Sequence, residues 1–150
     1  MSIVYRVDKE KGILFAVWDG AVTEDEVLDH LRRLVADPDW PTIKRLHLTD
    51  LRTTTAYLNI DETIIKKMVA LLGKSPGKLA KLKMAMVANE AFAISTTFQR
   101  LMSIYPLSMI AFNSLDTACT WLGINAVDTE RALDQLRARA REGKGLQGKD

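Results

Sequence analysis

The sequence predicts an α/β protein built on a single mixed sheet of about five strands, with an N-terminal hairpin and a C-terminal helix. Two β-rich apolar runs at the start of the chain are separated by a short polar segment that contains a glycine. Apolar runs then alternate with amphipathic helical patterns. In residues 82–122 this alternation is strand, helix, strand, helix, and connections of this length imply parallel strands joined by a right-handed crossover.

The first two strands are predicted over residues 3–7 and 13–18. The glycine of the segment 8–12 suits the hairpin turn between them. Both alternating faces of residues 13–18 are apolar, which indicates a strand that is covered on both sides. Asp19 and Gly20 are expected to end this strand.

A helix and a third strand follow. Thr23 and Glu26 form a capping-box pattern at the start of the helix, and its apolar stripe ends before Pro38. Residues 45–51 predict the third strand. His47 is one of the polar residues that alternate with leucines along it, so one face of this strand is expected to be less buried.

The next segment, residues 52–59, shows no clear element. Asp61 is the expected N-cap of a second helix, which Gly73 closes. Residues 74–81 are expected to form a loop broken by Pro76.

Residues 82–88 and 108–112 predict the last two strands. A helix is expected between Asn89 and Pro106, and another after Ser114. The element order is therefore β-β-α-β-α-β-α-β-α, followed by a terminal helix.

The end of the chain predicts a surface helix over residues 128–142. We expect residues 1–142 to form one domain and residues 143–150 to form a flexible tail.

Composition excludes several classes of protein. A net charge of +2 is too small to indicate a nucleic-acid binder, and no apolar stretch is long enough to span a membrane. The single cysteine, Cys119, excludes an intrachain disulfide. His30 and His47 have no further ligands at metal-binding spacing, so we expect neither metal nor cofactor. The expected location is the cytoplasm.

A family resemblance rests on four features of the C-terminal half. These are the strand Met84-Ala-Met-Val87, a helix that ends before Pro106, a strand that ends in Phe112, and the segment Ala118-Cys-Thr-Trp121-Leu122. With these features the chain resembles the STAS-type fold (sulphate transporter and anti-sigma factor antagonist) over residues 1–123. It most resembles the bacterial branch of sporulation anti-sigma-factor antagonists. The resemblance implies a small regulatory or interaction domain, with kinship to lipid-binding Sec14-like domains.

The candidate site lies between the third strand and the next helix. Phosphorylated STAS domains carry an Asp-Ser-Ser-Gly-like turn there, whereas this chain has Asp50-Leu-Arg-Thr-Thr-Thr55, with no serine pair and no glycine. Thr53, Thr54 and Thr55 each offer a hydroxyl for phosphate, or their hydroxyls bind local backbone. Arg52 is placed either to hold an anionic group or to pair with Asp50.

Topology directs attention to the same segment, because ligands of open α/β sheets bind beyond the carboxyl ends of the parallel strands. The other residues expected at this rim have simpler explanations as turn or cap residues: Asp19, Asn89, Asn113 and Ser114.

Six lysines and no acidic residue lie between Thr63 and Asn89. Lys66 and Lys67 are the candidate docking face for an acidic protein partner or an anionic membrane surface. The alternative is an ordinary solvated face.

Three functions remain. The leading one is a non-enzymatic STAS-like regulatory or protein-interaction domain, whose protein partner is unknown. The second is a carrier of a small apolar or lipid-like ligand, in which methionines line an adaptable pocket: Met68, Met84, Met86, Met102 and Met109. An enzyme ranks last, because no nucleophile with its base can be named. The sequence is compatible with a homodimer but does not require one.

Overall fold

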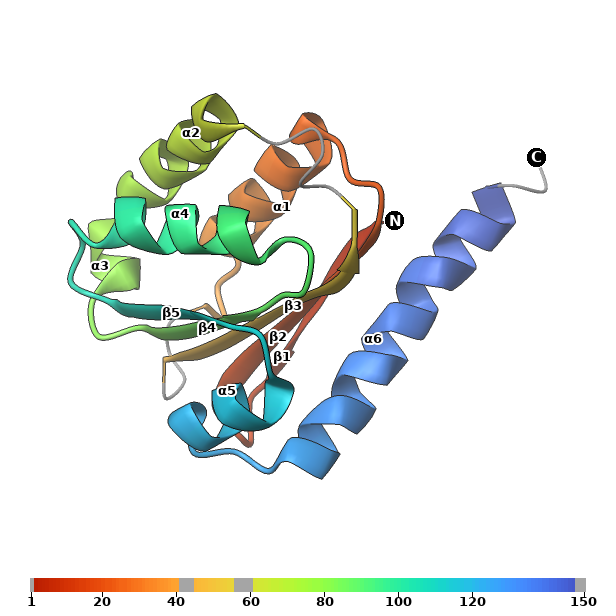
Figure 1. The fold of residues 1–150 in the computed structure, drawn as a ribbon. Coiled ribbons are helices and arrows are strands. Elements are labelled where there is room, and N and C mark those ends of the chain that lie inside the picture. The colour runs from red at the N-terminus through yellow and green to blue at the C-terminus, as the bar shows by residue number, and fades with distance from the viewer. Residues whose placement is uncertain (1, 41–44, 56–60, 148–150) are drawn as a thin grey trace.

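The structure, a computed structural model, describes residues 2–40, 45–55 and 61–147, with side chains as far as residue 142. One five-stranded sheet with the strand order β1-β2-β3-β4-β5 forms its centre (Figure 1). β1 and β2 pair antiparallel, and the other neighbouring strands pair parallel. The predicted fold class, with its N-terminal hairpin and C-terminal helix, is therefore confirmed.

The described elements follow the predicted order, with one additional short helix, α3. In chain order they are β1 (Ile3–Asp8), β2 (Ile13–Gly20), α1 (Glu24–Ala36), β3 (Leu46–Thr54), α2 (Glu62–Gly73), α3 (Pro76–Leu79), β4 (Lys83–Val87), α4 (Phe92–Met102), β5 (Ser108–Phe112), α5 (Leu115–Leu122) and α6 (Ala126–Gln147).

The order of the strands determines which helices cover which face. From β2 to β5 each parallel strand is added beside the preceding one in the same direction. Right-handed crossovers then place the connecting helices α1, α2 and α4 on one face. Helices α5 and α6 follow the last strand and lie on the opposite face (Figure 1).

The side chains of β2 alternate between two apolar cores. Leu14, Ala16 and Trp18 face the core under α1, α2 and α4. Ile13, Phe15 and Val17 face the core under α5 and α6. The prediction that this strand is covered on both sides is confirmed.

Side-chain caps begin three of the helices at the predicted residues. Thr23 Oγ1 accepts from the Glu26 N–H at 3.2 Å. An Asp61 carboxylate oxygen accepts from the Ile64 N–H at 3.0 Å. Ser114 caps α5 in the same way. Each cap satisfies an amide that has no partner within the helix.

The predicted end of β2 at Asp19 is wrong. A register shift follows Val17, after which Asp19 pairs with Thr53 and Gly20 pairs with Thr54. Both strands are longer than predicted because the added residues of one strand pair with those of the other. Three residues of the segment expected to lack a clear element, 52–54, therefore belong to β3.

Three other local predictions are also corrected. The expected loop after α2 contains α3, and Pro76 suits its first turn because a missing N–H costs nothing there. Asn89 does not cap α4, which starts after Ala91; the Asn89 side chain lies instead against the Arg52 carbonyl, at 3.5 Å. The face of β3 that contains His47 is buried, because helices cover both sides of the sheet.

Helix α6 is longer at both ends than the predicted helix over residues 128–142. Leu133, Leu136 and Ala140 are buried on the side that faces the sheet. Among the described helices, none combines the length and the apolar character needed to span a membrane.

Candidate functional site

Two features of the structure are candidate sites, one charged and one apolar. The first is a charged network between α6 and the carboxyl ends of β2 and β3. We call it the rim network, and it consists of Asp19, Asp50, Arg52, Thr53, Glu130, Asp134, Arg137 and Arg141.

Asp50 is the centre of the rim network and is fully buried. Strand alternation turns it and Arg52 toward α6. Arg52 Nε donates to Asp50 Oδ1 at 3.0 Å, and Arg52 Nη2 donates to Oδ2 at 2.9 Å. Arg137 Nη2 donates to the same Oδ2. Two guanidinium groups therefore compensate one buried carboxylate.

Arg52 also links β3 to α6. Its Nη1 and Nη2 donate to the two carboxylate oxygens of Glu130, at 3.2 and 2.6 Å. Hydrogen bonding to Asp50, assisted by Glu130, raises the pKa of the Arg52 guanidinium. An added anion would have to displace one of these carboxylates.

Thr53 lies between two charged groups. Its hydroxyl donates to Asp19 Oδ1 at 2.7 Å and accepts from Arg137 Nε at 3.2 Å. Arg141 in turn donates through Nε to Asp19 Oδ2 at 3.1 Å. This threonine therefore belongs to the attachment of α6.

The remaining two threonines are placed differently. The buried Thr54 hydroxyl donates to the Gly20 carbonyl at 2.9 Å. Thr55 is exposed, and its backbone N–H donates to that carbonyl. The candidate residues at positions 50–55 therefore do not form one open loop.

The lysine-rich stretch does not form a single face. Lys67 pairs with Glu24 at 2.8 Å, and the neighbouring Lys66 lies 4.0 Å from a Glu62 oxygen on the same helix. Lys83 lies in the sheet, where its ammonium is 4.5 Å from the centre of the Trp121 ring on α5. Lys66 and Lys67 remain exposed on α2.

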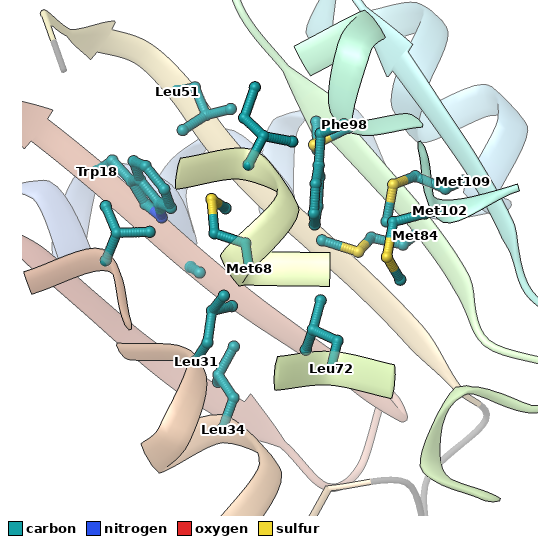
Figure 2. Packing of buried hydrophobic residues seen from close by; sticks show 14 of the residues in the cluster. Trp18, Leu31, Leu34, Leu51, Met68, Leu72, Met84, Phe98, Met102 and Met109 are labelled. Atoms are coloured by element: carbon teal, nitrogen blue, oxygen red, sulfur yellow. The ribbon is translucent and has the colours of Figure 1, made fainter. Parts of the chain in front are cut away.

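The second feature is a cavity of about 60 Å³ between the sheet and helices α1, α2 and α4. Figure 2 shows part of its wall: Trp18 from β2 and Phe98 from α4 lie on either side of Met68 from α2. Met84 and Met86 contribute from β4. Met102 and Met109 belong to the same core but do not line the cavity.

Two residues that line the cavity, Trp18 and His47, each have a buried ring nitrogen, Nε1 and Nδ1, with no hydrogen-bond partner in the described structure. Other polar groups there are satisfied: the Ser95 hydroxyl donates to the Ala91 carbonyl at 2.9 Å, and His47 Nε2 lies 3.2 Å from Thr49 Oγ1. An unsatisfied buried polar group costs about 1–3 kcal/mol. The two unpaired nitrogens therefore destabilise the folded protein unless a bound molecule supplies a partner.

The described wall of the cavity contains no acidic residue, lysine, arginine or cysteine. Burial, assisted by the nearby His47 and Arg33, lowers the pKa of His30 to about 3. Burial also lowers the pKa of His47 to about 4. Both histidines are neutral at pH 7, so these described lining residues are uncharged.

Other chemistry-bearing residues are dispersed. Within residues 2–40, 45–55 and 61–142, no three His, Cys, Asp or Glu side chains are grouped to hold a metal ion. Cys119 is buried on α5, and this burial is the main cause of the raised pKa of its thiol.

The sequence reasoning named Asp50, Arg52 and Thr53 but missed their partners on α6. One signal was available, because Arg137 is four residues after Leu133 and therefore shares its inward face. A buried arginine requires a carboxylate, and Asp50 is the acid inside the third predicted strand.

Three of the five methionines expected to line a pocket, Met68, Met84 and Met86, do line the cavity. The position of the cavity itself depends on how three helices pack, which no sequence pattern gives.

Comparison with known proteins adds no family assignment to this geometry. No family model matches the chain, and no curated protein matches it at a significant level.

Proposed function

We propose that this protein is a non-enzymatic binding domain that holds a small apolar molecule in the cavity under α1, α2 and α4. The observation that carries the proposal is an apolar cavity of which two lining residues, Trp18 and His47, each have an unpartnered buried nitrogen. A ligand that fills the void regains dispersion contacts, and a polar atom on it offers one of these nitrogens a partner.

Water is a poor alternative occupant. A buried water molecule typically makes about three hydrogen bonds to polar groups. The described wall offers only two unsatisfied nitrogens, and their residues lie apart in the sheet, because His47 pairs with Leu14, four residues before Trp18. An organic molecule fits this mostly apolar surface better.

The same wall supports a binding role over a catalytic one. A general base works best with a pKa near the working pH, whereas burial lowers the pKa of His30 to about 3 and that of His47 to about 4. The hydroxyls of Ser95 and Thr49 are possible nucleophiles on this wall, but both already have hydrogen-bond partners within the fold.

The test is a titration of protein labelled with ¹³C at the methionine methyl groups, with 2-methylbut-1-ene as the apolar probe. The methyl signals of the lining residues, Met68, Met84 and Met86, should shift and saturate. Met102 and Met109 should shift less because they lie away from the wall. Absence of a saturable shift at the three lining methionines would overturn the proposal.

Two Leu→Phe variants provide the matched control. Leu31 lines the cavity, so Leu31→Phe should fill it and abolish the methyl shifts. Leu133 is buried in the opposite core, so Leu133→Phe should preserve them, although it overpacks that core. Native mass spectrometry of protein purified from cells then gives the mass of the natural ligand.

A STAS-like regulatory role through a protein partner is the second candidate, favoured by the position of Thr53. A phosphoryl group on its hydroxyl would place negative charge beside Asp19 and would remove the hydrogen bond that the hydroxyl donates. Contacts between α6 and β3 would weaken, and the apolar surface around Leu133 would become available to a partner.

Thr53→Glu tests this role, with Thr55→Glu as the control outside the rim network. Hydrogen exchange of α6 amides should accelerate in Thr53→Glu only, and the two variants should differ in the partner that they recover in pull-downs. Equal exchange and equal recovery would reject the candidate. Charge reversal of Lys66 and Lys67 tests the docking face on α2 in the same assay.

A further inference from the structure

Trp18 limits the chemistry of the molecule that the cavity can hold. An indole Nε1–H is a hydrogen-bond donor and never an acceptor. Figure 2 shows this nitrogen on the side of the ring nearer Met68, among apolar side chains. The His30 ring meets the Trp18 ring edge-on, with their centres 6.2 Å apart. The missing partner of the Trp18 N–H is therefore an acceptor atom, and no described residue supplies one.

His47 Nδ1 does not restrict the ligand in the same way. Its role depends on the tautomer, because the Thr49 hydroxyl can either donate to His47 Nε2 or accept from it. Trp18 is a donor in every state, so we assign the ligand's acceptor to Trp18.

Charge and size limit the ligand further. The described wall contains no charged residue to compensate an ionised ligand, and an uncompensated buried charge is strongly unfavourable. The volume of about 60 Å³ is well below the cavity of about 150 Å³ that holds benzene in an engineered protein. The part of the ligand held inside therefore has only a few non-hydrogen atoms.

We propose that the ligand is a small uncharged molecule with an apolar body and one oxygen, as in a ketone, ester or alcohol, which accepts a hydrogen bond from Trp18 Nε1. This inference rests on the proposed ligand-binding function and specifies its ligand. A carboxylate or an amine of the same size is excluded by its charge, and a pure hydrocarbon leaves the indole N–H without a partner.

The experiment compares two probes of nearly the same shape, butan-2-one and 2-methylbut-1-ene, in which C=O replaces C=CH₂. Both should shift the methyl signals of Met68, Met84 and Met86. Only butan-2-one should move the indole ¹⁵N–¹H signal of Trp18 downfield. Trp40 and Trp121 act as internal references, because neither lines the cavity. Butanoate should produce no shift.

Substitution of Trp18 isolates the hydrogen bond from the different hydration of the two probes. Trp18→Phe should weaken butan-2-one binding about tenfold relative to 2-methylbut-1-ene. Trp121→Phe, on the opposite face, should leave the ratio of the two dissociation constants unchanged.

The possible outcomes separate this inference from the proposed function. If both probes bind but Trp18→Phe leaves their ratio unchanged, the ligand class is wrong and the binding function stands. Tighter binding of butanoate than of butan-2-one would also overturn the ligand class. If neither neutral probe shifts the methionine signals, the binding function itself fails.

Discussion

Asp50 shows how one buried charge is made compatible with an apolar core. Its carboxylate receives donors from Arg52 and Arg137, one from its own strand and one from α6. Two arginines on one carboxylate would leave excess positive charge, and Glu130 and Asp134 offset it at the outer side of each guanidinium. Each charge in the rim network is therefore compensated by its neighbours, and the loss of one leaves another uncompensated.

Loss of the Asp50 charge should destabilise the fold strongly. Asp50→Asn removes the buried anion of Arg137 and leaves it only the exposed Asp134, and a broken buried ion pair costs about 3–5 kcal/mol. We expect the free energy of unfolding in urea to fall by about 3 kcal/mol. Asp134→Asn removes an exposed partner of the same arginine and should cost less than about 1 kcal/mol. Equal losses in the two variants would contradict this account.

At the scale of elements, Gly73 shows how the end of α2 is fitted to its neighbours. A Cβ at this position would lie 2.7 Å from Tyr105 Cζ and still closer to the Tyr105 hydroxyl. The glycine at the end of α2 therefore makes room for a side chain from the segment between α4 and β5. Closure by a glycine was predicted from the sequence, whereas this packing reason was not available there.

Gly73→Ala and Gly77→Ala should change stability in opposite directions. The alanine at position 73 must displace the Tyr105 ring, and overpacking of this kind costs about 1–3 kcal/mol. Nothing lies within 4 Å of a Cβ at Gly77 in α3, so alanine there should gain up to about 1 kcal/mol by restricting the unfolded chain. Urea unfolding measures both changes, and stabilisation by Gly73→Ala would contradict the predicted clash.

For the whole molecule, the fold and some site residues could be predicted from local patterns, but the contacts that form the sites could not. The apolar alternation of residues 13–18 and the caps at Thr23 and Asp61 each depend on neighbours in sequence, and the structure confirms them. The burial of Asp50 depends on α6, more than 80 residues away. Pairing between distant segments also lengthened β3, which removed part of the expected open loop.

The two cores respond differently to pH, because the chain has only two histidines and both lie in the core with the cavity. Burial lowers the pKa of His30 to about 3 and that of His47 to about 4, against about 6.5 in an unfolded chain. Below pH 6.5 the unfolded chain therefore binds protons that the folded protein does not, and stability falls as pH falls toward 4. Between pH 7 and 5.5 we expect a loss of about 2–3 kcal/mol in urea unfolding, before most carboxylates titrate. His47→Gln should roughly halve this slope, and constant stability across this interval would show that the buried histidines are not neutral in the folded protein.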